Sequence, residues 1–152
     1  MSSATSEQQL KTFIAKFEPS NQRLIRSVRK WMRQRMPSAN ELVYDNYNFF
    51  VIGYCPSLRP TDSILSIAAG ANGVGISFGY IGTKIPDPHK ILLGAGKLNR
   101  FIRVESMETL ERPEVQALIT AAIGVVKVAL PATGKGTLVI RSISAKQRPR
   151  RG

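Results

Sequence analysis

The sequence predicts a single α+β domain, in which an antiparallel sheet of about five strands is covered by helices. Three observations carry this prediction. Apolar residues repeat at helical spacing over 6–36, strand-forming residues dominate 41–105, and an apolar segment follows at 115–130. The chain has 152 residues, which is the size of one domain and enough to bury a core.

Two N-terminal helices are predicted over the first 36 residues. Ser6 followed by Gln9 has the spacing of a capping box, and apolar residues then recur on one face up to Phe17. A second helix is expected over 21–36, apolar on one side and basic on the other, and ended by Pro37. We expect the two helices to cover one side of a sheet.

The sheet is predicted from residue 41 onward. Residues 41–55 are rich in aromatic and β-branched types, with a bend or bulge near Asn46 and Asn48 between two strand pieces. Strands at 63–70 and 74–81 flank Asn72-Gly73, which suits a tight turn with positive φ at both central residues.

The strand at 74–81 alternates apolar residues with Gly75, Ser77 and Gly79. Its small-residue side would allow close approach of a ligand or of a helix, and we favour a helix because a sheet needs a cover.

The last third predicts a strand at 99–105 and then a helix that begins near Pro113, a residue suited to a first helical position. Because residues 115–130 are almost wholly apolar, we expect this helix to be long and to lie at the centre of the core. A short strand is expected at 137–140. Residues 1–140 would form the domain, and 141–152 a flexible basic tail, too polar to join a core.

The net charge of +12 is concentrated in two segments. Residues 23–35 and 127–152 contain no acidic residue, whereas 36–126 are nearly neutral. Such segments attract nucleic acid and other polyanions, although a solvated helix face and a solubilising tail explain them equally simply, and we favour that explanation. The candidate polyanion-binding residues are Arg23, Arg26, Lys30, Arg33, Lys146, Arg148, Arg150 and Arg151.

Candidate side chains for a small-ligand site gather in residues 84–103, between proline and glycine hinges. Glycine exposes backbone N–H groups, and a neighbouring lysine adds positive charge, so a small anion is the ligand that this segment suits. The candidate ligand-binding residues are Tyr44, Asp45, Asp87, His89, Lys97 and Arg100.

Several kinds of chemistry are disfavoured by the sequence. The glycine-lysine pairs at 96–97 and 134–135 lack the other residues of a phosphate loop. One cysteine, Cys55, and one histidine, His89, cannot build a zinc site of four such ligands, and no local pattern pairs His89 with a nucleophile. We therefore expect no catalytic residues and no cofactor. Acidic residues near 105–114 could hold a hard cation, but complementing a helix dipole explains them better.

The location expected from the sequence is the cytoplasm. The first residues lack the basic and apolar regions of a signal peptide, and no apolar run reaches the roughly 18 residues of a membrane span. A single cysteine also excludes an intrachain disulfide, in keeping with a reducing compartment.

Five stretches, in the same order along most of the chain, resemble the YdhG-like family, a bacterial domain of unknown function. They are VYDNYNFFVIGY (43–54), RPTDSILSIAAGANGVGISF (59–78), IPDPHKILLGAGKLNRFIRVES (85–106), RPEVQALI (112–119) and SAKQRPRR (144–151). The resemblance implies a compact α+β domain with an antiparallel sheet covered by helices. Some members are described as frataxin-like iron-handling proteins, and the corresponding hypothesis for this chain is iron binding by Asp45, Asp87, His89 and nearby glutamates. The chain departs from the acidic surface of such proteins, with ten acids against 22 bases.

The function expected from the sequence is a non-catalytic binding or accessory domain, whose unknown ligand is a small anion or a protein partner. A frataxin-like iron chaperone and a weak nucleic-acid or polyanion binder are the alternatives.

Overall fold

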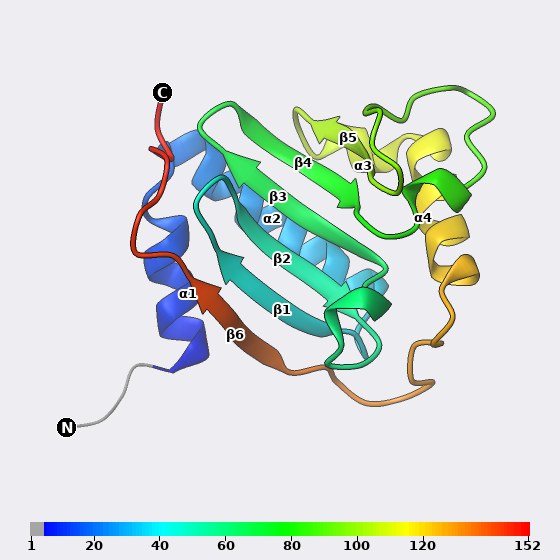
Figure 1. Ribbon diagram of the computed structural model, residues 1–152, viewed down its shortest axis with the longest axis horizontal. Helices are drawn as coiled ribbons and strands as arrows, with labels where there is room; N and C mark the ends of the chain where they lie inside the picture. Colours follow the sequence, from blue (N-terminus) through cyan, green and yellow to red (C-terminus); the bar gives the residue numbers. More distant parts are fainter. Residues whose placement is uncertain (1–4) are drawn as a thin grey trace.

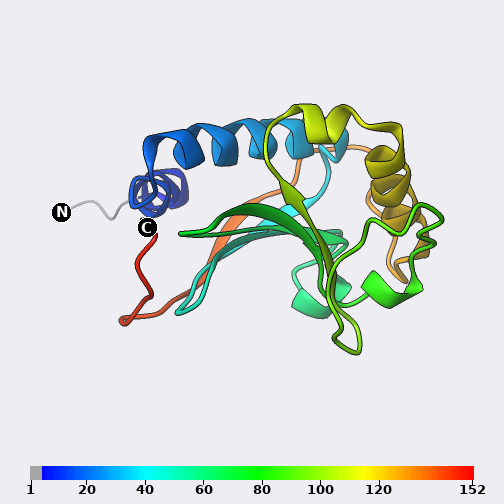
Figure 2. The same ribbon diagram turned by 90° about the horizontal axis from the view of Figure 1, so that it is seen from above.

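The computed structural model describes residues 5–152 as an α+β fold with two layers. A six-stranded sheet is covered on one side by α1 and α2, and its other side is bare (Figures 1 and 2). Residues 1–4 of the predicted domain lie outside the described residues. No helix among residues 5–152 is both long enough and apolar enough to cross a membrane.

Helix α1 (Ser6–Ile14) begins one residue earlier than the capping box predicts. Thr5 is the N-cap: its hydroxyl accepts from the Gln8 N–H at 3.1 Å, and its own N–H donates to Gln8 Oε1 at 2.8 Å. Ser6–Gln9 and Thr5–Gln8 have the same spacing, so the pattern fixes the motif but not its register. Leu10, Phe13 and Ile14 are buried against the sheet.

Helix α2 (Pro19–Arg35) starts at Pro19, two residues before the predicted start at residue 21. Proline is favoured at the first turn because its missing N–H would have no helical partner there. Ile25, Val28 and Met32 are fully buried beneath the helix, whereas Arg23, Arg26 and Lys30 are exposed on its outer side.

The sheet contains β1 (Asn40–Asp45), β2 (Phe50–Cys55), β3 (Leu65–Gly70), β4 (Gly73–Phe78), β5 (Arg100–Val104) and β6 (Leu138–Ile143). Their order is β5-β4-β3-β2-β1-β6, antiparallel except for β6, which runs parallel to β1. The prediction of an antiparallel sheet of about five strands is therefore wrong in two respects: the sheet has six strands, and β6 is parallel to its neighbour. Residues 126–137 return from α4 to the end of the sheet at which β1 begins, so β6 runs beside β1 in the same direction.

The hairpin between β3 and β4 turns one residue earlier than predicted. Gly70 pairs with Gly73, so Ala71 and Asn72 form the two-residue loop. Gly73 has a positive φ of 129°, whereas Asn72 does not have a positive φ. The prediction of positive φ at both Asn72 and Gly73 is therefore wrong, although the hairpin itself is confirmed.

The two faces of the sheet differ in chemistry because strand residues alternate between them. Phe50, Ile52, Ile67, Ile76 and Phe78 are buried with the helices in one core. The opposite face presents small residues, including Ser66, Ala68, Gly75 and Ser77, and these are only partly buried. Helices cover the large-residue side, so the expectation that a helix packs on Gly75 and Ser77 is wrong.

The last helices lie at one end of the sheet, not at its centre (Figure 1). A short α3 (Glu108–Glu111) leads into α4 (Pro113–Val125), which buries Val115, Leu118, Ile119 and Ala122. The long core helix expected to Leu130 ends at Val125, because Gly124 and the β-branched valines after it are poor helix formers.

The C-terminal segment is part of the fold. Gly136 donates its N–H to the Pro37 carbonyl, and a Cβ there would overlap the Ala39 carbonyl, so only glycine lets β6 begin beside β1. Residues 141–143 belong to β6, and Arg150 is 4% exposed. A boundary after residue 140 thus cuts through a strand. The segment joins the core, despite its basic composition, because an acidic partner is buried with Arg150.

Candidate binding groove on the open face of the sheet

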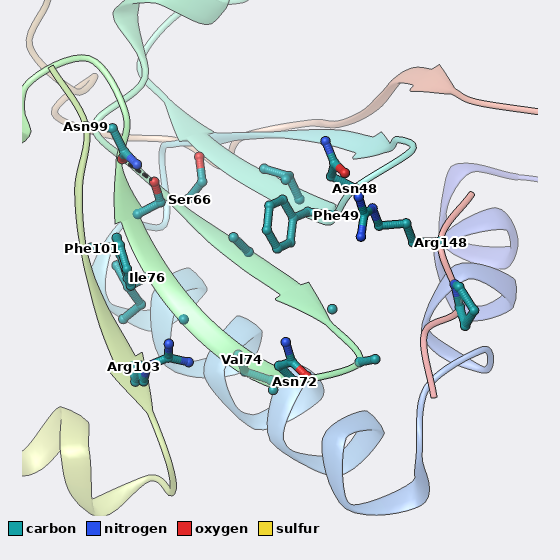
Figure 3. Close-up of a pocket in the computed structure, with 18 of the residues that line it drawn as sticks. Asn48, Phe49, Ser66, Asn72, Val74, Ile76, Asn99, Phe101, Arg103 and Arg148 are labelled. Atoms are coloured by element: carbon teal, nitrogen blue, oxygen red, sulfur yellow. Dashed lines mark hydrogen bonds between the residues drawn. The ribbon is translucent and has the colours of Figure 1, made fainter. Parts of the chain in front are cut away.

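A groove of about 930 Å³ lies on the bare face of the sheet (Figure 3). Its floor comes from β2, β3 and β4, one wall comes from β5, and the other comes from the β1–β2 turn and the C-terminal segment. Three strand spacings of about 4.8 Å make the floor roughly 14 Å across. The groove lies on the opposite side of the sheet from α1 and α2.

Small residues form the floor of the groove. In the pairing register, Val51 is opposite Ala68, Ala68 is opposite Gly75, and Gly75 is opposite Arg103. A side chain at Gly75 would lie 2.9 Å from the Ile102 carbonyl oxygen, which keeps this position small. A floor with short side chains allows a flat group to approach the sheet closely.

Two aromatic rings face the groove from opposite walls (Figure 3). Phe49 precedes β2 and is 54% exposed, with its ring in van der Waals reach of Gly70. Phe101 in β5 pairs with Ser77, and its ring lies against Gly94 of the preceding loop. Phe49 is exposed and Phe101 is half-buried, and exposed apolar rings cost hydration free energy, so this pair on one concave face indicates a surface for an apolar or aromatic group.

Three arginines line the groove, and none of its lining residues among those described is acidic. Arg103 comes from β5, whereas Arg148 and Arg151 come from the C-terminal segment. The Arg148 guanidinium lies 5.6 Å from the centre of the Tyr47 ring, a cation–π distance. Within residues 5–152, neither Arg103 nor Arg148 forms an ion pair, so both charges are available to an anion.

The C-terminal wall is held in place by Asp45, which is fully buried. Its carboxylate accepts from Lys16 Nζ at 2.7 Å and from Arg150 Nη2 at 3.0 Å. Its backbone carbonyl accepts from the Gln147 amide at 2.8 Å. Two residues on, the Tyr47 carbonyl accepts the Arg148 N–H at 2.9 Å, which positions Arg148 at the groove.

The protonation state of Asp45 follows from these contacts. Burial alone would raise the pKa of its carboxyl, but hydrogen bonds from Lys16, Gln147 and Arg150 outweigh burial and lower the pKa below the ordinary 3.8. Asp45 is therefore ionised at neutral pH, and it balances two cations that would otherwise repel each other at the end of α1.

A second buried charge cluster stabilises the helix-covered side of the sheet. Arg29 of α2 donates to both oxygens of Glu41, each at 2.9 Å, and also contacts Glu7 of α1 at 2.7 Å. Tyr54 donates to Glu41 Oε2 at 2.9 Å, and burial raises the pKa of Tyr54 well above its usual value. These contacts tie both helices to β1 and β2, so they have a structural role.

The structure separates the candidate ligand-binding residues of the sequence. Tyr44 and Asp45 are consecutive in β1 and point to opposite faces, because strand side chains alternate. Tyr44 pairs with Val51 on the open face, and its buried hydroxyl has no hydrogen-bond partner among the described residues. Asp45 faces α1 through Lys16.

The other four candidates lie in the segment before and at the start of β5. Asp87 accepts the N–H groups of Ile91 and Leu92, both at 3.0 Å, so its carboxylate shapes the loop. Arg100 donates to the carbonyls of Gly96 and Asn99. His89 and Lys97 are exposed. Because β5 lies four strand spacings from β1, roughly 19 Å, Tyr44 is not brought to these residues.

The candidate polyanion-binding residues fall on two surfaces. Arg23, Arg26, Lys30 and Arg33 are exposed on α2, and Arg33 lies 3.9 Å from Glu41. Arg148 and Arg151 line the groove instead, and Lys146 is exposed beside them. Arg150 is withdrawn from solvent by Asp45, so it does not offer its charge to a ligand.

The described residues offer no evident metal centre: nowhere in 5–152 do three or more His, Cys, Asp or Glu side chains come together to hold an ion. Cys55 is buried, and its thiol donates to the Arg59 carbonyl at 3.1 Å. Of the residues of the iron hypothesis, Asp45 lies in β1, whereas Asp87 and His89 lie in the loop before β5.

Sequence reasoning missed Phe49, Phe101 and Arg103 as site residues. The sequence feature that could have indicated them is the small-residue side of the strand at Gly75 and Ser77. This side would have been interpreted as a ligand surface if the helices had been assigned to the opposite face of the sheet. Comparison with known proteins adds no independent guide, since no family model, curated protein or solved structure matches the chain.

Proposed function

We propose that this protein is a non-catalytic binding domain, which holds an anionic ligand with a flat apolar part in the groove. The observation that carries the proposal is the pairing of Arg103 and Arg148 with the exposed ring of Phe49 and the half-buried ring of Phe101, in a groove with no acidic residue among its described lining residues. Arginine suits this task, because its planar guanidinium binds phosphate and carboxylate oxygens in a bidentate manner and stays charged at any physiological pH.

The proposal therefore places the anion site in the groove, and no longer in residues 84–103 as the sequence predicted. Lys97 lies just before β5, and Arg100 is its first residue, so both add positive potential at the end of the wall that β5 forms. The residues proposed to contact the anion are Arg103 and Arg148. The frataxin-like alternative stays an untested prediction, and we do not favour it because residues 5–152 contain no group of three or more His, Cys, Asp or Glu side chains that could hold a metal ion.

Titration with thymidine monophosphate tests the proposal, with uncharged thymidine as the matched control. Amide chemical shifts should move at Gly75, Ser77 and Phe101 with the monophosphate and far less with thymidine. Substituting both Arg103→Gln and Arg148→Gln should weaken binding by roughly tenfold or more, because each lost bond is to a charged group. Unchanged shifts at these amides, or equal binding of both ligands, would contradict the proposal.

A second candidate function is polyanion association through the exposed basic face of α2. Arg23, Arg26 and Lys30 have no acidic partner within residues 5–152, so their charges add to a common potential. This surface lies on the opposite side of the molecule from the groove (Figure 2). A double substitution, Arg26→Gln with Lys30→Gln, should reduce heparin retention without changing binding of thymidine monophosphate.

A further inference from the structure

We infer that the ligand of the groove is a single-stranded oligonucleotide, whose bases stack on Phe49 and Phe101 while its phosphates contact Arg103 and Arg148. This inference rests on the proposed function and specifies its ligand class. Both arginines and both rings belong to one continuous groove (Figure 3).

The size of the groove favours a short strand over a mononucleotide. The ring of Phe49 lies beside Gly70, which pairs with Gly73, whereas Phe101 pairs with Ser77, four residues further along β4. The two rings are thus roughly 13 Å apart along the strands. One base cannot contact both rings at that separation. Sheets of this width that present exposed aromatic residues accommodate two or three unstacked bases of a single strand.

The charge pattern favours a phosphate backbone over an acidic protein. Arg103 and Arg148 also stand on opposite walls, beside Phe101 and Phe49 respectively, so each wall offers one cation and one ring. Each nucleotide of a single strand offers the matching pair of groups, a backbone phosphate and a base with an aromatic face. A duplex is disfavoured, because its base faces are stacked inside and unavailable to the rings.

The floor explains how bases could reach the sheet. Ala68, Gly75 and Ser77 keep the surface between the rings low, and Asn99 offers an amide whose oxygen already accepts from the Ser77 hydroxyl at 2.6 Å. Apart from Asn48, Asn72 and Asn99, the lining side chains cannot read a base edge with paired donors and acceptors. Binding should therefore be tolerant of sequence.

Fluorescence anisotropy of the full chain tests the inference, using a labelled oligothymidylate of about ten nucleotides. The decisive control is an abasic strand of the same length and charge. Stacking predicts that the abasic strand binds at least about tenfold more weakly. An oligouridylate and a duplex of equal length complete the series, and they show whether the site prefers DNA, RNA or neither.

Substitutions separate the contribution of the rings from that of the charges. Phe49→Leu with Phe101→Leu keeps the apolar bulk and should weaken oligothymidylate binding by roughly tenfold, while leaving the abasic strand unaffected. Phe49→Trp should restore most of the loss in the Phe101→Leu background, which excludes misfolding as the cause. Arg103→Gln should weaken both strands and lower the salt-dependence slope by about 0.7.

Equal affinity for the normal and abasic strands would overturn the inference. So would an unchanged affinity in the Phe49→Leu, Phe101→Leu variant, or competition by polyglutamate as strong as that by oligothymidylate, which would assign the groove to an acidic protein. In each case the proposed function survives if thymidine monophosphate still binds through Arg103 and Arg148. Loss of that binding would contradict both the proposed function and the oligonucleotide inference.

Discussion

At the scale of single residues, Asp45 links the stability of the fold to the shape of the groove. It is the buried anion between Lys16 and Arg150, and its backbone carbonyl holds Gln147. Removing its charge leaves the Arg150 guanidinium buried without compensation, which costs far more than losing an exposed pair. The position of the C-terminal wall therefore depends on one carboxylate.

Asp45→Asn is predicted to lower the free energy of unfolding by about 3 kcal/mol, because it leaves a buried cation unpaired. The matched control is Lys16→Met, which removes the half-exposed partner and should cost about 1 kcal/mol or less. Urea unfolding followed by circular dichroism measures both values. Equal losses in the two variants would show that Arg150 is not the partner that matters.

The free energy of unfolding should depend on pH through the titration of the Asp45 carboxyl. The folded-state pKa of Asp45 lies below the ordinary 3.8, so its contribution is fully present above pH 3.8 and disappears as pH falls through the lower folded value. The stability difference between the wild type and Asp45→Asn should thus be constant at neutral pH and shrink below about pH 4. Urea unfolding between those limits tests this, and a difference that does not change with pH would contradict it.

At the scale of elements, β6 shows most clearly where sequence reasoning stopped. Alternation and turn residues located β1 to β5 to within two or three residues, because each of these strands has its own local pattern. The sixth strand pairs across almost one hundred positions, and its position depends on the close approach of Gly136 to Ala39. The sequence predicted a short strand at 137–140, but only the three-dimensional pairing reveals its extension to Ile143, its partner β1 and its parallel direction.

Gly136→Ala should destabilise the docking of β6, because the added Cβ would overlap the Ala39 carbonyl. We expect a loss of about 2–3 kcal/mol in the free energy of unfolding and faster amide exchange in β6. Gly79→Ala is the matched control: no heavy atom lies within 4 Å of a Cβ there, so its stability should change by at most about 0.5 kcal/mol. Wild-type exchange rates in Gly136→Ala would contradict the proposed role of this glycine.

At the scale of the whole molecule, the sheet separates two basic surfaces. Helix α2, with its exposed basic residues, lies on one side of the sheet (Figure 2). The arginines of the groove lie on the open face of the sheet. The charge segments of the sequence predicted the cations of α2 and those of the C-terminal segment, but neither Arg103, which lies outside both segments, nor the separation of the two surfaces. The side of the sheet on which each group lies depends on the path of the whole chain. The candidate site was displaced for the same reason: Tyr44 and Asp45 are neighbours in sequence and face opposite sides.

The separation of these surfaces permits one direct measurement of where an anionic ligand binds. Two-dimensional amide spectra of the full chain, recorded during titration with an oligothymidylate, report on both surfaces at once. We predict shifts at Ser66, Ala68, Gly75 and Ser77, with the outer residues of α2 nearly unchanged at moderate salt. Shifts confined to Arg23, Arg26 and Lys30, with the open face of the sheet unaffected, would contradict the groove as the binding site.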